Sequence, residues 1–233
     1  MPDTDQNQRL SRGQQRKARL REVILKRDIN GLSAWAKRDR NPLSTLTSML
    51  FDSDPLTRWR AIEAVGLVAR DIAADDLDKV RRQVGQYFWM MNDESGNLCW
   101  YAAEAIGEIM VNIPRLVMEY GIIISSYLDE EPFEAGVRHA MRRMIESDIV
   151  PAAIMTRYRE LSVNIVESLT HKKPAVRGQA ILALRALKDR TAVESITKMK
   201  DDHGTFDYYD FESGQLHSMT VGSAAAMYLG VST

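Results

Sequence analysis

Two tryptophan–glutamate pairs are the residues of this chain best suited to recognise a ligand. Trp59 lies four residues before Glu63, and Trp100 lies four residues before Glu104. On a helix, each pair would share one face. A tryptophan ring and a carboxylate on one helical turn can hold a cation through ring face and charge together. The alternative is that the tryptophans pack between helices and the glutamates pair with Arg60 or Arg138.

Catalytic chemistry has little support in the sequence. The four histidines form no HExxH pattern and no repeated His–Glu pairs, so no metal site is predicted. The single cysteine, Cys99, is predicted to be a small buried hydrophobe rather than a nucleophile, and it cannot form an internal disulfide. The sequence contains no glycine-rich phosphate loop. We therefore predict no catalytic residue and no cofactor, and we leave open whether the protein is an enzyme.

Charge is unevenly spread along the 233 residues. Residues 1–40 hold eleven Lys/Arg against five Asp/Glu and carry +6, so the remainder carries −7 within a net charge of −1. This predicts a basic N-terminal arm or capping helix over residues 1–40 and a second domain over residues 41–233. The arm could contact nucleic acid, an anionic membrane surface or the acidic body, or it could be a solvated helix. With neither a membrane-spanning run nor a signal-peptide core, a cytoplasmic protein is expected.

An internal repeat organises the second domain. The stretches WRAIEAVGLVA from Trp59 and WYAAEAIGEIM from Trp100 share Trp, Ala, Glu, Ala and Gly at an offset of 41. Weaker copies begin at Val137, Ala180 and Ser223. Repetition at this spacing is typical of stacked helical hairpins, which bury a continuous core only together. The alanines that align in the five copies are Ala64, Ala105, Ala140, Ala183 and Ala226.

Another helix is predicted before each copy, and a turn between the two partners. In LDKVRRQVGQYFWM, apolar residues recur from Leu77 at helical spacing. The turns DSDP, DESGN, DEEP and HKKP carry acids and prolines that favour a helix start. The last unit differs, because Phe206 and Tyr208 alternate with polar neighbours and predict a short β-hairpin within residues 205–220. The hairpin would be an end cap or an aromatic recognition loop.

The small-residue helices AIEAVGLVA, AAEAIGEIM and AILALRALK, with the stretch PAVRGQA, resemble the HEAT-like repeat family, particularly the short repeats named after phycobilisome lyases. The resemblance covers about residues 41–230. It implies an all-α fold, a right-handed, armadillo-like α-solenoid of about five helical hairpins. It implies little about function, because such repeats serve lyases, scaffolds, hydroxylases and DNA glycosylases.

In solenoids of this type the second helix of each hairpin lines the concave surface. The first three units would therefore offer their side chains to one groove, with an acid-rich turn at its rim. Cys99, Ala102, Ala105 and Ile106 would face the core instead. The candidate binding residues are Trp59, Arg60, Glu63, Asp93, Glu94, Trp100, Tyr101, Glu104, Arg138 and His139.

We expect a non-catalytic binding or adaptor protein that takes a protein partner on its concave face. Nucleic acid is a less favoured partner, no membrane span is predicted, and the oligomeric state stays open. Two enzymes are the alternatives: a HEAT-like DNA glycosylase that grips a cationic damaged base with the Trp/Glu pairs, or a bilin-lyase-like enzyme. The acidic body argues against the glycosylase, since it would repel phosphates. No separate feature of the sequence supports a tetrapyrrole site.

Overall fold

Helices make up most of the structure, and two short strands lie near its C-terminal end. The computed structural model describes residues 11–92 and 98–231. The prediction of a mostly helical chain with one hairpin within residues 205–220 is confirmed. The α-helices of the described residues are α1 (Arg12–Leu25), α2 (Ile29–Arg38), α3 (Pro42–Thr47), α4 (Pro55–Ala73), α5 (Leu77–Met91), α6 (Ala102–Asn112), α7 (Val117–Ser125), α8 (Glu134–Glu146), α9 (Ala152–Glu160), α10 (Ser162–Glu167), α11 (Pro174–Leu187), α12 (Val193–Thr197) and α13 (Val221–Leu229). Two 3-10 turns, η1 (Pro114–Leu116) and η2 (Ser168–Thr170), and the strands β1 (Thr205–Asp210) and β2 (Gln215–Thr220) complete the set.

Capping side chains and prolines fix where several helices begin. Asp54 caps α4 by accepting a hydrogen bond from the Thr57 backbone N–H at 3.0 Å, and Pro55 is the first helical residue. Asp76 caps α5 in the same way. The predicted turn DSDP therefore starts a helix as expected. The expected turn DESGN lies outside the described residues.

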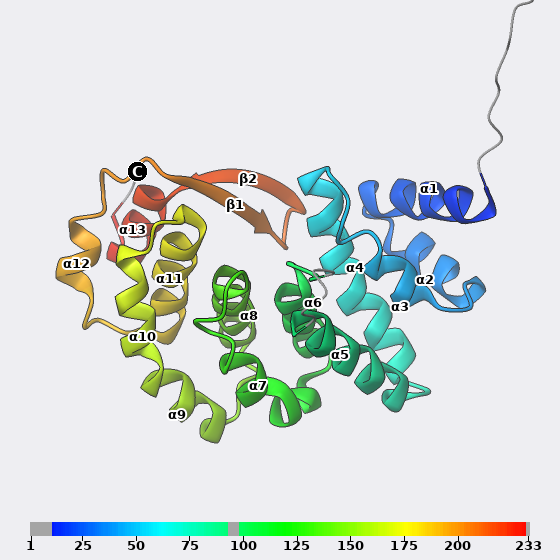
Figure 1. The fold of residues 1–233 in the computed structure, drawn as a ribbon, viewed down its shortest axis with the longest axis horizontal. Coiled ribbons are helices and arrows are strands. Elements are labelled where there is room, and N and C mark those ends of the chain that lie inside the picture. The colour runs from blue at the N-terminus through cyan, green and yellow to red at the C-terminus, as the bar shows by residue number, and fades with distance from the viewer. Residues whose placement is uncertain (1–10, 93–97, 232–233) are drawn as a thin grey trace, which may run out of the picture.

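The five helices that carry the repeated sequence pack on one another in chain order: α4 on α6, α6 on α8, α8 on α11, and α11 on α13. Their aligned alanines are all buried. Gly107 shows how close two of these helices come, because a Cβ added there would lie 2.7 Å from the Cβ of Ala140 on α8. The intervening helices α5, α7 and α9 lie on the outer side of the row (Figure 1).

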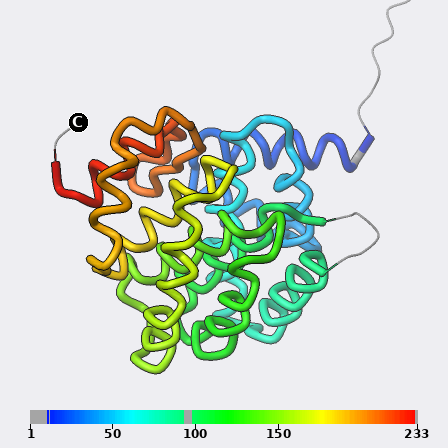
Figure 2. The backbone as a smooth tube through the Cα atoms, turned by 60° about the vertical axis from the view of Figure 1, so that its left-hand side comes forward, coloured from blue at the N-terminus to red at the C-terminus, as the bar shows by residue number. Residues whose placement is uncertain are grey.

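The β-hairpin crosses the molecule and does not stay beside the last helices. Its strands pair antiparallel from Thr205↔Thr220 to Asp210↔Gln215. The row of helices curves into an arc, and the hairpin runs across the open side of that arc from α11 and α13 to α4 (Figure 1). Both views place α1 and the hairpin on the same side of the molecule (Figures 1 and 2).

The basic N-terminal helices belong to the same core as the repeats. Leu20 and Ile24 of α1 and Leu32 of α2 are buried, and both helices pack on α4. Residues 11–92 and 98–231 contain no helix with the length and apolar character that a membrane crossing requires.

Candidate functional site

A pocket of about 300 Å³ lies where the first turns of α6, α8 and α11 face strand β1. We call it the Glu104 pocket, after the one glutamate that lines it. Its lining residues are Trp59, Trp100, Tyr101, Glu104, Pro132, Ala135, Gly136, Ala175, Gln179, Phe206 and Asp207.

The Glu104 carboxylate is buried in this pocket without a charged partner. Its side-chain atom Oε2 has no hydrogen-bond partner among the described residues. The backbone of Gly136 on α8 lies close to this carboxylate, because a Cβ added at Gly136 would be 2.5 Å from the Glu104 Oε2 atom. Burial raises the pKa of Glu104 from 4.5 to about 8, and only its own backbone N–H acts in the opposite direction. Burial therefore favours the protonated, neutral form of Glu104.

Further unpaired polar atoms surround Glu104. The Oε1 atom of Gln179 and the indole Nε1 of Trp59 are both buried without a partner in the described part of the chain. Trp100 lies at the mouth, with 65 % of its surface exposed. Tyr101 is half-buried, and the Arg58 guanidinium lies 5.0 Å from its ring centre. The pocket thus combines aromatic walls with buried hydrogen-bonding groups that no side chain of the described residues satisfies.

A second hollow, of about 390 Å³, lies beside this pocket and shares Trp100 and Tyr101 with it. It is lined on its far side by Leu50, Phe51 and Leu98. Phe51 has 54 % of its surface exposed, so two large aromatic side chains face solvent near the mouth of the Glu104 pocket.

The other predicted pair, Trp59 and Glu63, is covered by the hairpin. Glu63 accepts hydrogen bonds from Arg27 (2.6 Å) and from the Tyr209 hydroxyl (2.7 Å). Trp59 is 4 % exposed and stacks on the Tyr209 ring, with centroids 5.9 Å apart and planes 7° apart. The face of α4 that the sequence placed in an open groove is therefore occupied by strand β1.

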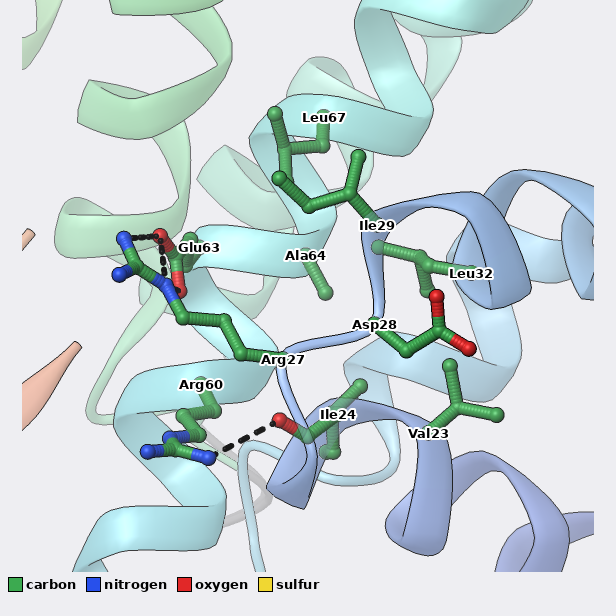
Figure 3. Close-up of a pocket in the computed structure, with 10 residues that line it drawn as sticks. All are labelled: Val23, Ile24, Arg27, Asp28, Ile29, Leu32, Arg60, Glu63, Ala64 and Leu67. Atoms are coloured by element: carbon green, nitrogen blue, oxygen red, sulfur yellow. Dashed lines mark hydrogen bonds and ion pairs between the residues drawn. The ribbon is translucent and has the colours of Figure 1, made fainter.

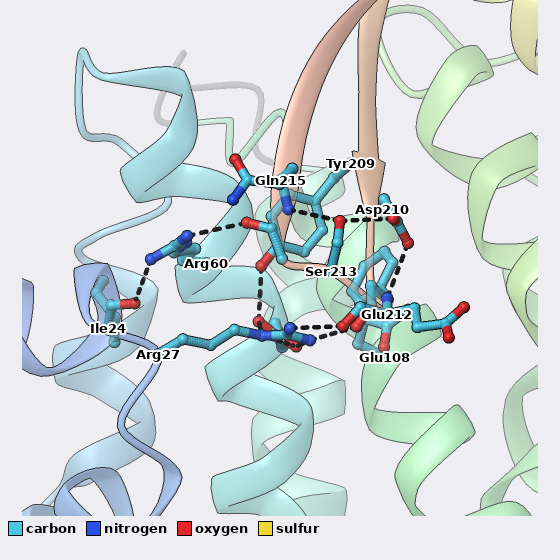
Figure 4. A network of polar contacts seen from close by, with 12 residues as sticks. Ile24, Arg27, Arg60, Glu108, Tyr209, Asp210, Glu212, Ser213 and Gln215 are labelled. Atoms are coloured by element: carbon cyan, nitrogen blue, oxygen red, sulfur yellow. Dashed lines mark hydrogen bonds and ion pairs between the residues drawn. The ribbon is translucent and has the colours of Figure 1, made fainter.

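Two arginines tie the turn of the hairpin to the N-terminal helices. Arg27, which follows α1, also donates to the carbonyls of Phe211 and Glu212. Arg60 of α4 donates to the carbonyls of Leu25 and Gly214. Figure 4 shows both arginines between α1 and the hairpin turn. We call this set the clasp: Arg27, Arg60, Glu63, Tyr209 and residues 211–214.

A shallow hollow at the clasp is lined by charged side chains that already bind other groups of the protein (Figure 3). Arg27 binds Glu63, Arg60 binds backbone carbonyls, and Asp28 caps α2 through the Gly31 N–H. The remaining lining is mostly apolar, so this hollow carries no unpaired charge that we can assign to a ligand.

Beneath the hairpin, a buried ion pair joins α6 to α8. Arg143 donates to both carboxylate oxygens of Glu108, at 2.6 and 3.1 Å. Burial raises the pKa of Glu108, and the hydrogen bonds from Arg143 act in the opposite direction. His139 lies next to this pair against Trp59, with ring centroids 5.0 Å apart. Burial lowers the pKa of His139 well below its usual value, so the imidazole is neutral.

The structure brings together four of the predicted site residues and uses the other described ones elsewhere. Trp59, Trp100, Tyr101 and Glu104 line one pocket. Arg60 and Glu63 belong to the clasp, and His139 lies under the hairpin. Arg138 is 1 % exposed and donates to the carbonyls of Leu128 and Glu134 and to the Asp129 carboxylate, so it holds the turn before α8. Asp93 and Glu94 lie outside the described residues.

Several residues that shape the site were missed by sequence reasoning. Gln179 and Gly136 lie on α11 and α8, and neither has a neighbour in the sequence that marks it as part of a site. Arg27 and Tyr209 were missed because their partner, Glu63, is far away in the chain.

Cys99 is buried as predicted, and burial raises the pKa of its thiol to about 12. In residues 11–92 and 98–231, no group of three or more His, Cys, Asp or Glu could hold a metal ion.

Comparison with known proteins identifies a distant relative. An uncharacterized protein of Archaeoglobus fulgidus is 27 % identical to this chain over 172 residues, which is 72 % of this chain and 85 % of that protein. No family model matches the sequence, and no solved structure matches it.

Proposed function

We propose that this protein is a non-catalytic binding protein that receives a positively charged group of a protein partner in the Glu104 pocket. The observation that carries the proposal is the buried Glu104 carboxylate, whose Oε2 atom lacks a partner within the described residues although the pocket is open to solvent. A buried acid without a partner costs stability. A ligand that donates hydrogen bonds to it would offset that cost.

The other groups of the pocket favour a cation over an anion. A protonated Glu104 could donate to an anion, but the Gln179 Oε1 and Asp207 carboxylate beside it are acceptors. Among residues 11–92 and 98–231, no Lys or Arg lines the pocket. An ammonium or guanidinium group supplies only donors and would satisfy acceptors from α6 and α11 together. A quaternary ammonium group would fit the aromatic walls but could donate no hydrogen bond.

The hollow beside Trp100 supports a protein as the source of this group. Exposed aromatic side chains around a deep pocket are the usual composition of a protein interface, where an anchoring side chain is surrounded by apolar contacts. Phe51 and Trp100 would provide those contacts, and a lysine or arginine of the partner would enter the pocket. The two exposed aromatics would then be covered by the same partner.

We also propose that the packed helices α4, α6, α8, α11 and α13 are the second helices of HEAT-like repeats in a right-handed solenoid. The support is that the aligned alanines fall at buried positions of helices that pack in chain order. Under this proposal the hairpin occupies part of the concave face, and the Glu104 pocket is the part left accessible.

Small cations test the pocket directly. We expect calorimetric titration to show binding of butylguanidinium or butylammonium and none of butanol or butyrate. Glu104→Gln should weaken that binding at least about tenfold, because a hydrogen-bonded charge contact is worth about 1.5–3 kcal/mol. Glu130→Gln, which alters an exposed carboxylate, is the matched control. Tighter binding of butyrate than of either cation would contradict the proposal.

A peptide tests the partner class. An arginine flanked by apolar residues should bind more tightly than butylguanidinium. Phe51→Ala should lower the affinity for the peptide and leave the affinity for butylguanidinium unchanged, because Phe51 lines the second hollow and not the Glu104 pocket. Equal effects on both probes, or none on either, would restrict the site to small molecules.

A further inference from the structure

The N-terminal helices form a basic track that no part of the proposed function uses. A groove of about 480 Å³ between α1 and α2 is lined by Arg16, Arg19, Trp35, Arg38 and Asp39, among others. A second groove, of about 360 Å³, is lined by Arg40, Lys79 and Arg82. Arg38 lines the first groove, and Arg40, two residues further along the chain, lines the second. We call the two grooves together the basic track.

Positive charge in the track is largely uncompensated. Asp39 is the only carboxylate among the lining residues, and Arg16 is paired with it. Arg82 has a distant contact with Asp76, at 3.6 Å. In the described part of the chain, the side chains of Arg19, Arg38, Arg40 and Lys79 form no ion pair with a carboxylate. Four side-chain cations without an ion-pair partner among the described residues therefore line the two grooves, in a protein whose net charge is −1.

We infer that the basic track binds single-stranded nucleic acid. Five of its six cations are arginines, whose planar fork matches phosphate oxygens better than a lysine ammonium does. Trp35 is half-buried and lines the first groove together with Arg19 and Arg38. Arginines that follow a phosphate backbone beside an aromatic platform for a base are the usual elements of single-strand recognition. An acidic protein segment would use the charges but would gain nothing specific from the indole.

The track is independent of the Glu104 pocket. It shares no lining residue with that pocket and lies on α1, α2, α3 and α5 instead of on α6, α8 and α11. If Glu104→Gln abolishes or keeps cation binding, the inference about the basic track is unchanged. Equally, failure of the chain to bind an oligonucleotide would leave the proposal for the Glu104 pocket unchanged.

Fluorescence anisotropy with a labelled oligo-dT of about 12 nucleotides tests the inference, since single-strand sites span about 4–16 nucleotides. The full chain should bind at low salt, and affinity should fall linearly with salt on logarithmic axes. The double variant R19Q/R38Q should reduce the salt slope by about 1.4, because each phosphate contact on a single strand contributes about 0.7. Trp35→Leu should weaken binding about tenfold while keeping the salt slope, because stacking is not an ionic contact.

The control variant R159Q/R185Q removes two exposed arginines from α9 and α11, outside the track. It should bind the oligonucleotide as the unmodified chain does, and both arginine double variants should melt at the same temperature by circular dichroism. Trp35→Leu loses packing of a half-buried ring, so the control for this variant is that its circular dichroism shows a folded protein at the assay temperature. The inference is overturned if the unmodified chain fails to bind, or if R159Q/R185Q weakens binding as much as R19Q/R38Q. It is also overturned if polyglutamate of equal charge competes as well as unlabelled oligo-dT, or if Trp35→Leu has no effect. Those last two results would assign the track to an acidic protein.

Discussion

Glu104 and Glu108 lie one turn apart on α6 and are both buried, yet their carboxylates have opposite surroundings. Glu108 lies in the part of the molecule that the hairpin covers, where Arg143 holds both of its oxygens. Glu104 lies at the edge of the hairpin, with an oxygen that has no partner in the described residues. In the covered region, the Glu108 carboxylate is held by an arginine of the same chain. At the edge, the Glu104 carboxylate has no charged partner among the described residues.

Under the proposed function, this difference would separate a structural use of charge from a binding use. Burying an ion pair gains little over an apolar pair, but removing one partner leaves an uncompensated charge and is costly. The covered region should therefore be sensitive to loss of an arginine. The pocket, which has no internal partner to lose, should tolerate or benefit from loss of its acid.

The largest expected effect is in the covered region. Arg143→Met should destabilise the protein by about 3–5 kcal/mol, because it leaves the buried Glu108 without a partner. It also removes the guanidinium that lies 4.0 Å from the centre of the Phe211 ring in the hairpin turn. Urea unfolding at neutral pH measures the change, with Arg159→Met as the exposed control. A loss below about 1 kcal/mol would mean that Glu108 is satisfied by protonation instead.

The clasp should contribute less, because it is partly exposed. Arg27→Met removes the hydrogen bonds to Glu63, Phe211 and Glu212 and should cost about 2 kcal/mol. Hydrogen exchange of the β1–β2 amides should accelerate in this variant. Lys26→Met, one residue earlier and on the surface, should change neither stability nor exchange. Unaltered exchange in Arg27→Met would show that the strands are held by Trp59 and Phe206 packing alone.

A pH titration sharpens the contrast at Glu104. Between about pH 5 and pH 8 the folded protein keeps a proton on Glu104 that the unfolded chain has lost, because the pKa is about 8 when folded and 4.5 ordinarily. The stability of the unmodified chain should therefore fall as pH rises, by about 1.4 kcal/mol per pH unit relative to Glu104→Gln. Cation affinity should rise over the same range, since the bound form needs the ionised acid. Parallel stability curves for the two proteins would show that Glu104 is ionised when empty.

The smallest expected effect comes from Tyr209→Phe. It removes one hydrogen bond to Glu63 and keeps the ring that stacks on Trp59, so a loss of about 1 kcal/mol is expected. Thermal melting and urea unfolding both measure this. If Tyr209→Phe lowers the free energy of unfolding as much as Arg143→Met does, then the clasp stabilises the covered region at least as much as the Glu108–Arg143 pair.

The helices could be predicted because their signal is local. Small residues recurring at an offset of 41 place Ala64 and Ala105 on buried faces, and alternation of aromatic and polar residues predicts the strands. The i,i+4 rule also places Trp59 and Glu63 on one face of α4 correctly. What covers that face is a contact between residues far apart in the chain, and no periodicity encodes it.

The second pair differs for a simpler reason. α6 begins at Ala102, so Trp100 precedes the helix and does not share its face with Glu104. Trp100 projects to the mouth of the pocket, whereas Glu104 lies in the first helical turn and is 6 % exposed. Helix boundaries are the least predictable feature of a sequence, and here a shift of two residues decides which side chain is exposed.

The clasp makes the two ends of the chain depend on each other. In a linear row of helices, an end helix can fray while the others stay folded. Here Arg27 reaches a carbonyl 185 residues away, so opening the first helices also frees the hairpin, and opening the hairpin exposes Trp59. We expect amides of α1 and α13 to exchange only with global unfolding, and a single cooperative transition in urea. Such a long-range contact forms late and slowly, so folding should be slower than that of an open helical array of the same length.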